Sequence, residues 1–211
     1  MKKYFHKTPF WLKMLYPDLI WDKKRDTLEK SVYLTFDDGP TPELTQWILT
    51  TLESFQMKGS FFCVGNNIEK YPDLYNEMVK QGHLVANHTF NHLNGWKTKT
   101  SEYLENVLSC EKSLSETSTQ IFRPPYGKVT RSQIKLLKKA GYQIVMWDVL
   151  SGDFDPGVSA KECLEKTIKH TKHGSIVVFH DNVKSASVLK EVLPQYLNFI
   201  RKNNYIARIW S

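Results

Sequence analysis

Ser31-Val32-Tyr33-Leu34-Thr35-Phe36-Asp37-Asp38-Gly39-Pro40 is the stretch from which the fold of this chain can be worked out. Its first six residues have the β-branched and aromatic content of a buried strand, and the Gly-Pro-Thr-Pro that follows the two acids ends this strand. Adjacent side chains on an extended segment point to opposite sides. Asp37 and Asp38 are therefore expected to face different surroundings, so that one can hold a metal and the other can handle a proton. Taken alone, the Asp-Asp-Gly turn fits a loop aspartate that caps the next helix equally well.

Strand and helix patterns alternate along the rest of the chain, which is typical of a βα fold with parallel strands. The groups that carry chemistry lie at strand ends or in the loops that follow, where barrel enzymes place their sites. Glycines 82, 141 and 174 come just after helical patterns, where a left-handed residue is expected. Further strands are predicted at 58–64, 83–87, 120–123, 143–148, 175–180 and 205–208, and helices at 42–55, 72–81, 101–117, 131–140, 160–173 and 185–203.

A pair of histidines, His88 and His92, lies four residues apart in His-Thr-Phe-Asn-His. On a helical turn these positions share a face, about 5–6 Å apart between Cβ atoms. Both rings can then reach one ion. Two histidines and one carboxylate, with a fourth position left open, are the ligand count of a catalytic zinc site. The histidine pair alone is a weak signal, but beside Asp37-Asp38 it predicts a metal site.

Two further stretches place polar groups at strand ends. In Arg123-Pro124-Pro125-Tyr126-Gly127 the prolines have no N–H, so the first free backbone donor after them belongs to Tyr126. A donor held on such a stiff turn suits an oxyanion hole, although a rigid turn with a surface arginine is the simpler interpretation. The apolar run 176–179 ends in His180-Asp181, as in a buried parallel strand. By itself His180 would more often be a hydrogen-bonded core residue than a proton carrier.

Taken together and in this order, the four stretches resemble the motifs of the polysaccharide deacetylase family, the NodB-homology domain of carbohydrate esterase family 4. The resemblance extends over residues 31–209. It implies an α/β fold, a distorted (β/α) barrel with about seven parallel strands, here with a short N-terminal helical extension. It also implies a metal-dependent hydrolase that removes acetyl groups, N-acetyl above all, from an N-acetylglucosamine-containing glycan or oligosaccharide. The implied ion is zinc, with cobalt, nickel or manganese as alternatives.

The resemblance also assigns roles to single residues. The metal ligands that it implies are Asp38, His88 and His92. The catalytic groups that it implies are the general base Asp37, the arginine Arg123 that orients this base, the backbone N–H of Tyr126 at the oxyanion, and the general acid His180.

One region, 147–155, departs from the family pattern Asp-x-x-Asp-Trp. Leu150 replaces the first acid and Phe154 replaces the tryptophan. Asp153 matches the acid that partners the catalytic histidine, and Asp148 is the alternative partner. The departure affects substrate preference more than reaction type. The substrate-binding residues expected are Tyr126, Trp147, Phe154 and Val178.

Composition and length agree with a single globular domain, since barrels of ~200–250 residues commonly form one domain. The chain has 211 residues, 41% of them hydrophobic and 24% charged, with a net charge of +7. Its lysines are spread along the sequence, which indicates a solvated basic surface before any attraction to anionic glycans. We see no nucleic-acid motif and expect a monomer whose partner is an acetylated carbohydrate. The three cysteines, Cys63, Cys110 and Cys163, indicate no disulfide framework.

The N-terminal 30 residues are interpreted as an extension, 1–30, of a catalytic domain at 31–211. Residues 8–16 have helical apolar spacing, which predicts a short helix that docks on the barrel and closes its bottom or the gap left by a missing strand. Attachment to a membrane surface is the second interpretation. Lys13 and Pro17 interrupt any signal-peptide core, and no stretch reaches the ~18 apolar residues of a spanning helix. These features predict a cytoplasmic protein, with envelope association as the alternative.

Two other functions stay open at this stage. One is a metal-dependent amidase or imidase that acts on a small non-sugar substrate. The other is a carbohydrate-binding pseudoenzyme that keeps the cleft without turnover.

Overall fold

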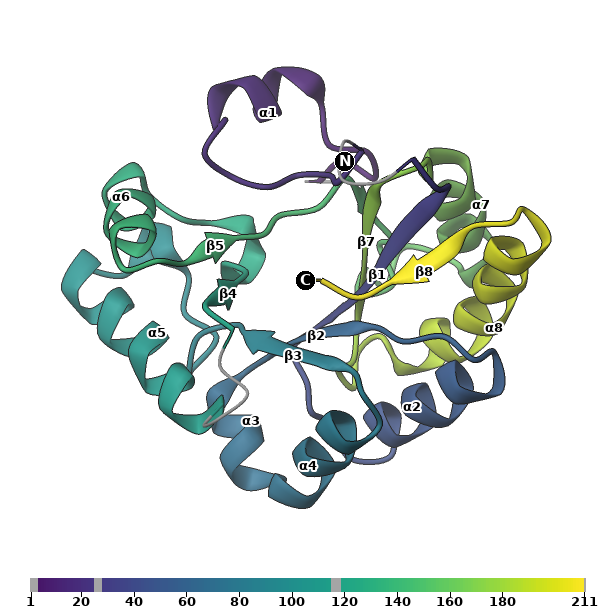
Figure 1. The fold of residues 1–211 in the computed structure, drawn as a ribbon, viewed down its shortest axis with the longest axis horizontal. Helices are drawn as coiled ribbons and strands as arrows, with labels where there is room; N and C mark the ends of the chain where they lie inside the picture. The colour runs from purple at the N-terminus through teal and green to yellow at the C-terminus, as the bar shows by residue number, and fades with distance from the viewer. Residues whose placement is uncertain (1–3, 25–27, 115–118, 211) are drawn as a thin grey trace.

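A curled sheet of parallel strands, surrounded by helices, forms the body of the protein (Figure 1). The computed structural model describes residues 4–24, 28–114 and 119–210. In this part of the chain seven strands follow the order β5-β4-β3-β2-β1-β7-β6, and β8 pairs with β1. The predicted fold class, a distorted (β/α) barrel, is confirmed. The strands are β1 (Ser31–Asp37), β2 (Ser60–Cys63), β3 (Leu84–Asn87), β4 (Ile121–Phe122), β5 (Gln143–Ile144), β6 (Val149–Leu150), β7 (Ser175–His180) and β8 (Ile206–Arg208).

The helices lie outside the sheet and match the predicted ones closely. Gly82 and Gly141, each directly after the C-cap residue of a helix, have φ of 76° and 91° as expected there. The last residues of the helix predicted at 101–117 lie outside the described part of the chain, and one additional helix, α3, was not predicted. The helices are α1 (Phe10–Leu15), α2 (Leu44–Ser54), α3 (Gly65–Lys70), α4 (Pro72–Lys80), α5 (Thr100–Leu114), α6 (Arg131–Lys139), α7 (Ala160–His170) and α8 (Ala186–Lys202).

Strand β1 separates two hydrophobic layers. Its residues Val32, Leu34 and Phe36 belong to the cluster packed under the outer helices. Tyr33 points the other way, into a smaller cluster inside the barrel that also contains Trp210. The alternation therefore directs the last inward residue of β1, Asp37, into the barrel mouth above this inner cluster.

The segment predicted as one strand at 143–148 is instead divided between two ends of the open sheet. β5 ends at Ile144, and the next backbone groups bond in turn to different partners. The N–H of Val145 donates to β4, that of Met146 to Ile20, and that of Asp148 to Ile176 of β7. Because the segment crosses the open side of the sheet, between its end strands β5 and β6, it does not keep one pairing partner, and β6 begins only at Val149.

The N-terminal segment, residues 4–24, spans this gap between β5 and β6. Ile20 forms a parallel bridge with Val145, while Lys7 and Asp22 form antiparallel bridges with Val149 and Ser175. Figure 1 shows α1 above this opening, between the side of β5 and α6 and the side of β7 and α7. The segment thus supplies backbone partners to sheet edges that would otherwise be open.

A buried carboxylate, Asp148, anchors this segment to the barrel. Its side chain is fully buried and accepts from the Nζ atoms of Lys7 and Lys13 at 2.5 and 2.6 Å. Ser175 Oγ donates a third bond, at 2.7 Å. Burial alone would raise the pKa of Asp148, but the hydrogen bonds from Lys13, Lys7 and Ser175 outweigh burial and lower this pKa.

Among the helices that the structure describes, none has both the length and the apolar character required to cross a bilayer.

This anchor predicts that Lys13→Met destabilises the protein. The substitution leaves the buried Asp148 carboxylate with one cation fewer, which we expect to lower the free energy of unfolding by about 1–3 kcal/mol in urea denaturation. The matched control is Lys138→Met, which removes the exposed pair with Asp18 and should change stability by less than about 0.5 kcal/mol. Equal effects of the two substitutions would contradict the anchoring role.

Candidate active site

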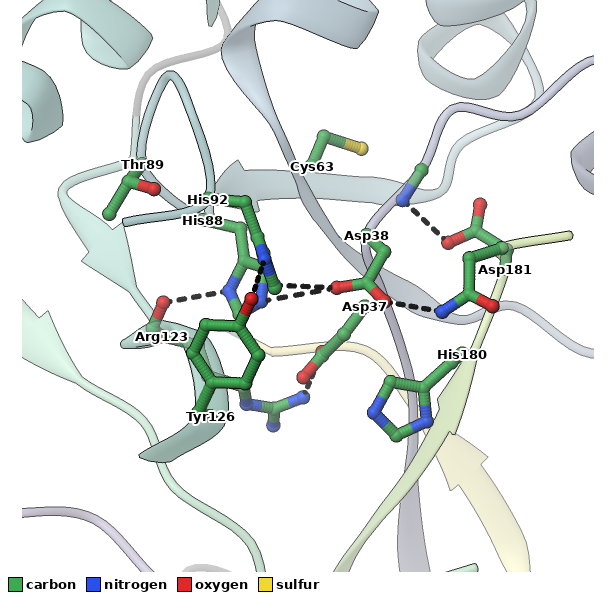
Figure 2. A network of polar contacts seen from close by, with 12 residues as sticks. Asp37, Asp38, Cys63, His88, Thr89, His92, Arg123, Tyr126, His180 and Asp181 are labelled. Atoms are coloured by element: carbon green, nitrogen blue, oxygen red, sulfur yellow. Dashed lines mark hydrogen bonds and ion pairs between the residues drawn. The ribbon is translucent and has the colours of Figure 1, made fainter. Parts of the chain in front are cut away.

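The site lies where the carboxyl ends of β1, β3 and β7 meet the turn after β4 (Figure 2). Asp37 is the last residue of β1, His180 is the last of β7, and His88 directly follows β3. The strands are parallel, so their polar end residues all arrive at one mouth of the barrel. This convergence is what the sequence pattern predicts.

Three of the predicted residues, Asp38, His88 and His92, form a cluster that can hold a metal ion. One ligand atom from each lies within 4.8 Å of the others. His88 Nε2 and His92 Nε2 are 3.5 and 3.0 Å from Asp38 Oδ1. The donor set is thus two imidazole nitrogens and one carboxylate oxygen, which suits zinc and several other divalent ions.

Hydrogen bonds on the far side of each ring orient the two histidines. His88 Nδ1 is 2.8 Å from the carbonyl oxygen of Arg123. A carbonyl only accepts, so Nδ1 carries the proton and Nε2 keeps its lone pair toward Asp38. His92 Nδ1 lies 3.1 Å from the Tyr126 hydroxyl, which again leaves Nε2 toward the carboxylate. Both rings are therefore preorganised as ligands through the same nitrogen.

Asp38 is held from its other side. It has a φ of 87°, in the left-handed region, so the chain turns sharply between the two acids. Asn182 Nδ2 donates to Asp38 Oδ2 at 2.5 Å, and Asn67 Nδ2 donates to its carbonyl at 2.8 Å. Burial favours a raised pKa for Asp38, but the His88 and His92 rings, which donate to it when they are protonated on Nε2, outweigh burial and lower this pKa far below its usual range.

The histidine pair does not lie on a helical turn, and this expectation is wrong. The residues between β3 and the short helix at Gly95–Lys97 form a loop, with φ of 63° at Thr89 and 55° at His92. Asn106 of α5 fixes the loop because its Oδ1 accepts from the N–H groups of Phe90 and Asn91. A tertiary contact therefore brings the two rings together, with centroids 5.1 Å apart.

Asp37 forms a buried ion pair with Arg123. Arg123 Nη1 donates to Asp37 Oδ1 at 2.6 Å, and the guanidinium is fully buried. The same nitrogen reaches Thr35 Oγ1, and the other two nitrogens donate to the carbonyls of Val145 and Met146. The arginine is therefore no surface residue on a rigid turn, and it fixes the direction of Asp37.

His180 is paired with Asp153, the first of the two partners considered. His180 Nδ1 lies 2.8 Å from Asp153 Oδ1, and the His180 backbone N–H donates to Oδ2. The alternative partner, Asp148, is occupied by the N-terminal lysines instead. Burial on its own would lower the pKa of His180, but the charge and hydrogen bond of Asp153 exceed this effect and raise it to about 9.

A cavity of about 860 Å³ opens above these groups. Tyr126, Trp147 and Phe154 line it, as expected for substrate-binding residues. Phe154 packs edge-on against the His180 ring, with centroids 4.8 Å apart. Val178 does not line the cavity; it is fully buried one step below His180 inside the barrel, and its pairing neighbour Leu150 forms the wall there.

Several residues of the site were not singled out from the sequence, among them Asn182, Asp181 and Tyr4. Asn182 binds Asp38, as described above. Asp181 is fully buried and accepts from the Gly39 N–H and Thr45 Oγ1, so it fixes the loop after the two acids, and burial raises its pKa well above the usual range. Asp181 stands beside His180 in the quoted motif and Asn182 is the next residue, which was the available signal. Tyr4 lines the cavity and donates to Asp155 at 3.0 Å, and no local pattern pointed to it.

Comparison with known proteins agrees with this geometry. The sequence profile of the family described as Polysaccharide deacetylase matches residues 24–145. The chain belongs to the polysaccharide deacetylase family. A peptidoglycan-N-acetylglucosamine deacetylase of Bacillus cereus (strain ATCC 14579) is 33% identical over 183 residues, 84% of each chain. The chain spans 62% of the length of a second Bacillus cereus protein of that name, also 33% identical.

Two further similarities are to a chitooligosaccharide deacetylase and to a solved deacetylase structure. A chitooligosaccharide deacetylase of Bradyrhizobium sp. (strain ANU 289) is 34% identical over 72% of this chain and 71% of its own. The crystal structure of the Bc1960 peptidoglycan N-acetylglucosamine deacetylase, in complex with a naphthalenyl N-hydroxybenzamide, has a TM-score of 0.78 and 29% identity. The aligned region covers 95% of this chain and 94% of that one. The prediction of a carbohydrate deacetylase is confirmed at the level of the family.

The Asp153–His180 pair predicts a measurable change in the titration of His180. In Asp153→Asn the imidazolium loses its carboxylate partner while burial continues to disfavour the charged ring. We therefore expect the pKa of His180 to fall from about 9 toward or below its ordinary value, measured by NMR titration of the imidazole protons in the metal-free protein. The control is Asp155→Asn in the same loop. An unchanged His180 titration in Asp153→Asn would exclude Asp153 as the cause.

Proposed function

We propose that this protein is a metal-dependent hydrolase that removes N-acetyl groups from an N-acetylglucosamine-containing glycan. The observation that supports this most strongly is that one possible metal-ligand cluster and two charged side-chain pairs lie together at one mouth of the barrel. The Asp38, His88 and His92 cluster lies at the cavity with Asp37 and its arginine, and with His180 and its aspartate. A metal site, an acid and a base are the parts that hydrolysis of an amide requires.

We propose zinc as the ion, with cobalt, nickel and manganese as alternatives. The chemistry of the donor set fits, because both histidines present Nε2 and Asp38 presents Oδ1. Asn182 and the carbonyl of Arg123 would act as outer partners that hold the ligands in place. When bound, such an ion acts as a Lewis acid that lowers the pKa of water and polarises a carbonyl.

In the proposed reaction Asp37 accepts a proton from the water that attacks the acetyl carbonyl. Arg123 keeps the Asp37 carboxylate pointed into the mouth through its 2.6 Å bond. The Tyr126 N–H would donate to the oxyanion that develops. His180, raised in pKa by Asp153, then gives its proton to the amine of the leaving sugar, so that water and amide become acetate and amine.

The substrate class follows from the cavity and from the relatives. Tyr126, Trp147 and Phe154 offer aromatic faces on which a sugar ring can stack. The relatives are named for peptidoglycan and chitooligosaccharides, and we extend this glycan class to the present chain. A location at the cell envelope would bring the enzyme to such a substrate. We assign catalysis to residues 31–211 and regard 1–30 as an extension that completes the barrel.

The base assignment predicts that Asp37→Asn abolishes turnover. The amide keeps the size of the carboxylate but cannot take the proton, so acetate release from N-acetylglucosamine oligomers should fall at least about 10²–10⁴-fold. Bound metal, measured by elemental analysis, should stay nearly unchanged. Asp18→Asn at the exposed N-terminal turn serves as the control. Activity at the wild-type level in Asp37→Asn would eliminate the proposed base.

The ligand assignment predicts a different result for His88→Ala. Loss of one of three protein ligands should weaken zinc binding by more than about 100-fold in calorimetric titration, together with activity. His170→Ala, outside the cluster, should bind zinc as the wild type does. Full zinc affinity in His88→Ala would remove this residue from the site.

A further inference from the structure

Helix α1 has its apolar and polar faces reversed relative to an ordinary surface helix. Phe10, Trp11, Met14 and Leu15 are 75%, 59%, 65% and 49% exposed. The helix's single charged residue, Lys13, instead points inward to the buried Asp148 and to Asp22, at 2.6 Å from each. A surface helix normally turns its apolar stripe to the core and its charges to water. Here the core accepts the lysine, and the large apolar side chains remain outside.

The four exposed side chains of α1 stand at positions i, i+1, i+4 and i+5, so they share one face of the helix and form an apolar patch. Phe5, five residues before the helix begins, is also 60% exposed. Among the described residues, five of the thirteen exposed large hydrophobic side chains therefore fall within residues 5–15. Single exposed apolar residues need no explanation, but such a concentration marks a surface that meets an apolar phase or a partner. None of the four α1 side chains is needed to hold the helix in place, since Leu12 and Lys13 do so.

The neighbouring surface is basic. Residues 15–19 and helix α6 together line a groove of about 480 Å³, to which α6 contributes Arg131, Lys135 and Lys138. All three are exposed on α6, beside α1 in Figure 1. Lys138 lies 3.5 Å from the Asp18 carboxylate, so the other two supply most of the free positive charge. The chain as a whole carries a net charge of +7.

We propose that α1 docks the protein on the surface of an anionic lipid bilayer. Phenylalanine, tryptophan, methionine and leucine on one face suit a helix that lies in the plane of the interface with this face in the acyl boundary. The basic residues of α6 would then face the anionic headgroups beside the helix. The charge beside the patch favours a lipid surface over an apolar protein face. The inference goes beyond the proposed function and does not depend on it.

The test is co-sedimentation of the full chain with vesicles of phosphatidylcholine, with and without one third phosphatidylglycerol. We expect binding to the anionic vesicles that weakens as salt is added. The double substitution Trp11→Ser and Met14→Ser should lower the partition coefficient at least about tenfold, since both side chains lose their contact with the acyl region. Lys135→Glu should lower it by about fivefold or more, because one attractive charge becomes repulsive.

Matched controls use exposed residues on helices other than α1 and α6. Leu108→Ser on α5, which removes another exposed leucine, and Lys190→Glu on α8 should bind as the wild type does. Equal melting temperatures and equal circular dichroism spectra in all variants would exclude misfolding as the cause of lost binding. Wild-type protein that does not sediment with anionic vesicles would overturn the proposal. The proposal would also be overturned if the protein did not bind vesicles but instead self-associated, or bound one particular protein partner, in a way that depended on Trp11 and Met14.

Discussion

The buried guanidinium of Arg123 is the constraint on which the rest of the site depends. It binds Asp37 and Thr35 on β1 and two carbonyls of the segment after β5, and it lies 3.9 Å from the ring centroid of Phe62. The arginine's own carbonyl accepts from His88. Arg123 thus fixes the proposed base and one proposed metal ligand at once. A buried ion pair adds little net stability, but removal of either partner leaves an unpaired charge in the core.

The polar site rests on layers that are mainly apolar. The outward residues of β1 pack under the helices, and Tyr33 and Trp210 fill the barrel interior. Inside this frame each polar group of the mouth has a partner: Asp38 has Asn182, His180 has Asp153, and Asp181 has Gly39 and Thr45. Such satisfied networks hold side chains in one orientation before a substrate arrives, which lowers the reorganisation that reaction requires.

The open barrel explains the N-terminal segment. The sheet edges at β5 and β6 do not meet, and residues 4–24 cover the gap with backbone bridges and with the lysine anchors on Asp148. The segment also reaches the active site, because Tyr4 packs against Phe154, which in turn packs against His180. The anchoring lysine faces inward, so the apolar residues of α1 are left on the outer surface. Closure of the barrel and the proposed membrane contact therefore have one structural origin.

Local pattern alone was sufficient for most of the strands and helices and for the polar residues that stand at the strand ends. An apolar run that stops at Asp37 or His180 identifies a buried parallel strand and the polar residue at its end. Both can be predicted because the run and the polar residue are neighbours in the sequence. Tertiary structure decided the features that join distant residues. Asp153 rather than Asp148 partners His180, and Asn106 bends the histidine loop that local spacing had suggested to be helical. Tyr4 reaches a partner 151 residues away. Such contacts depend on how the sheet curls and on which edge stays open, and no short stretch of sequence contains that information.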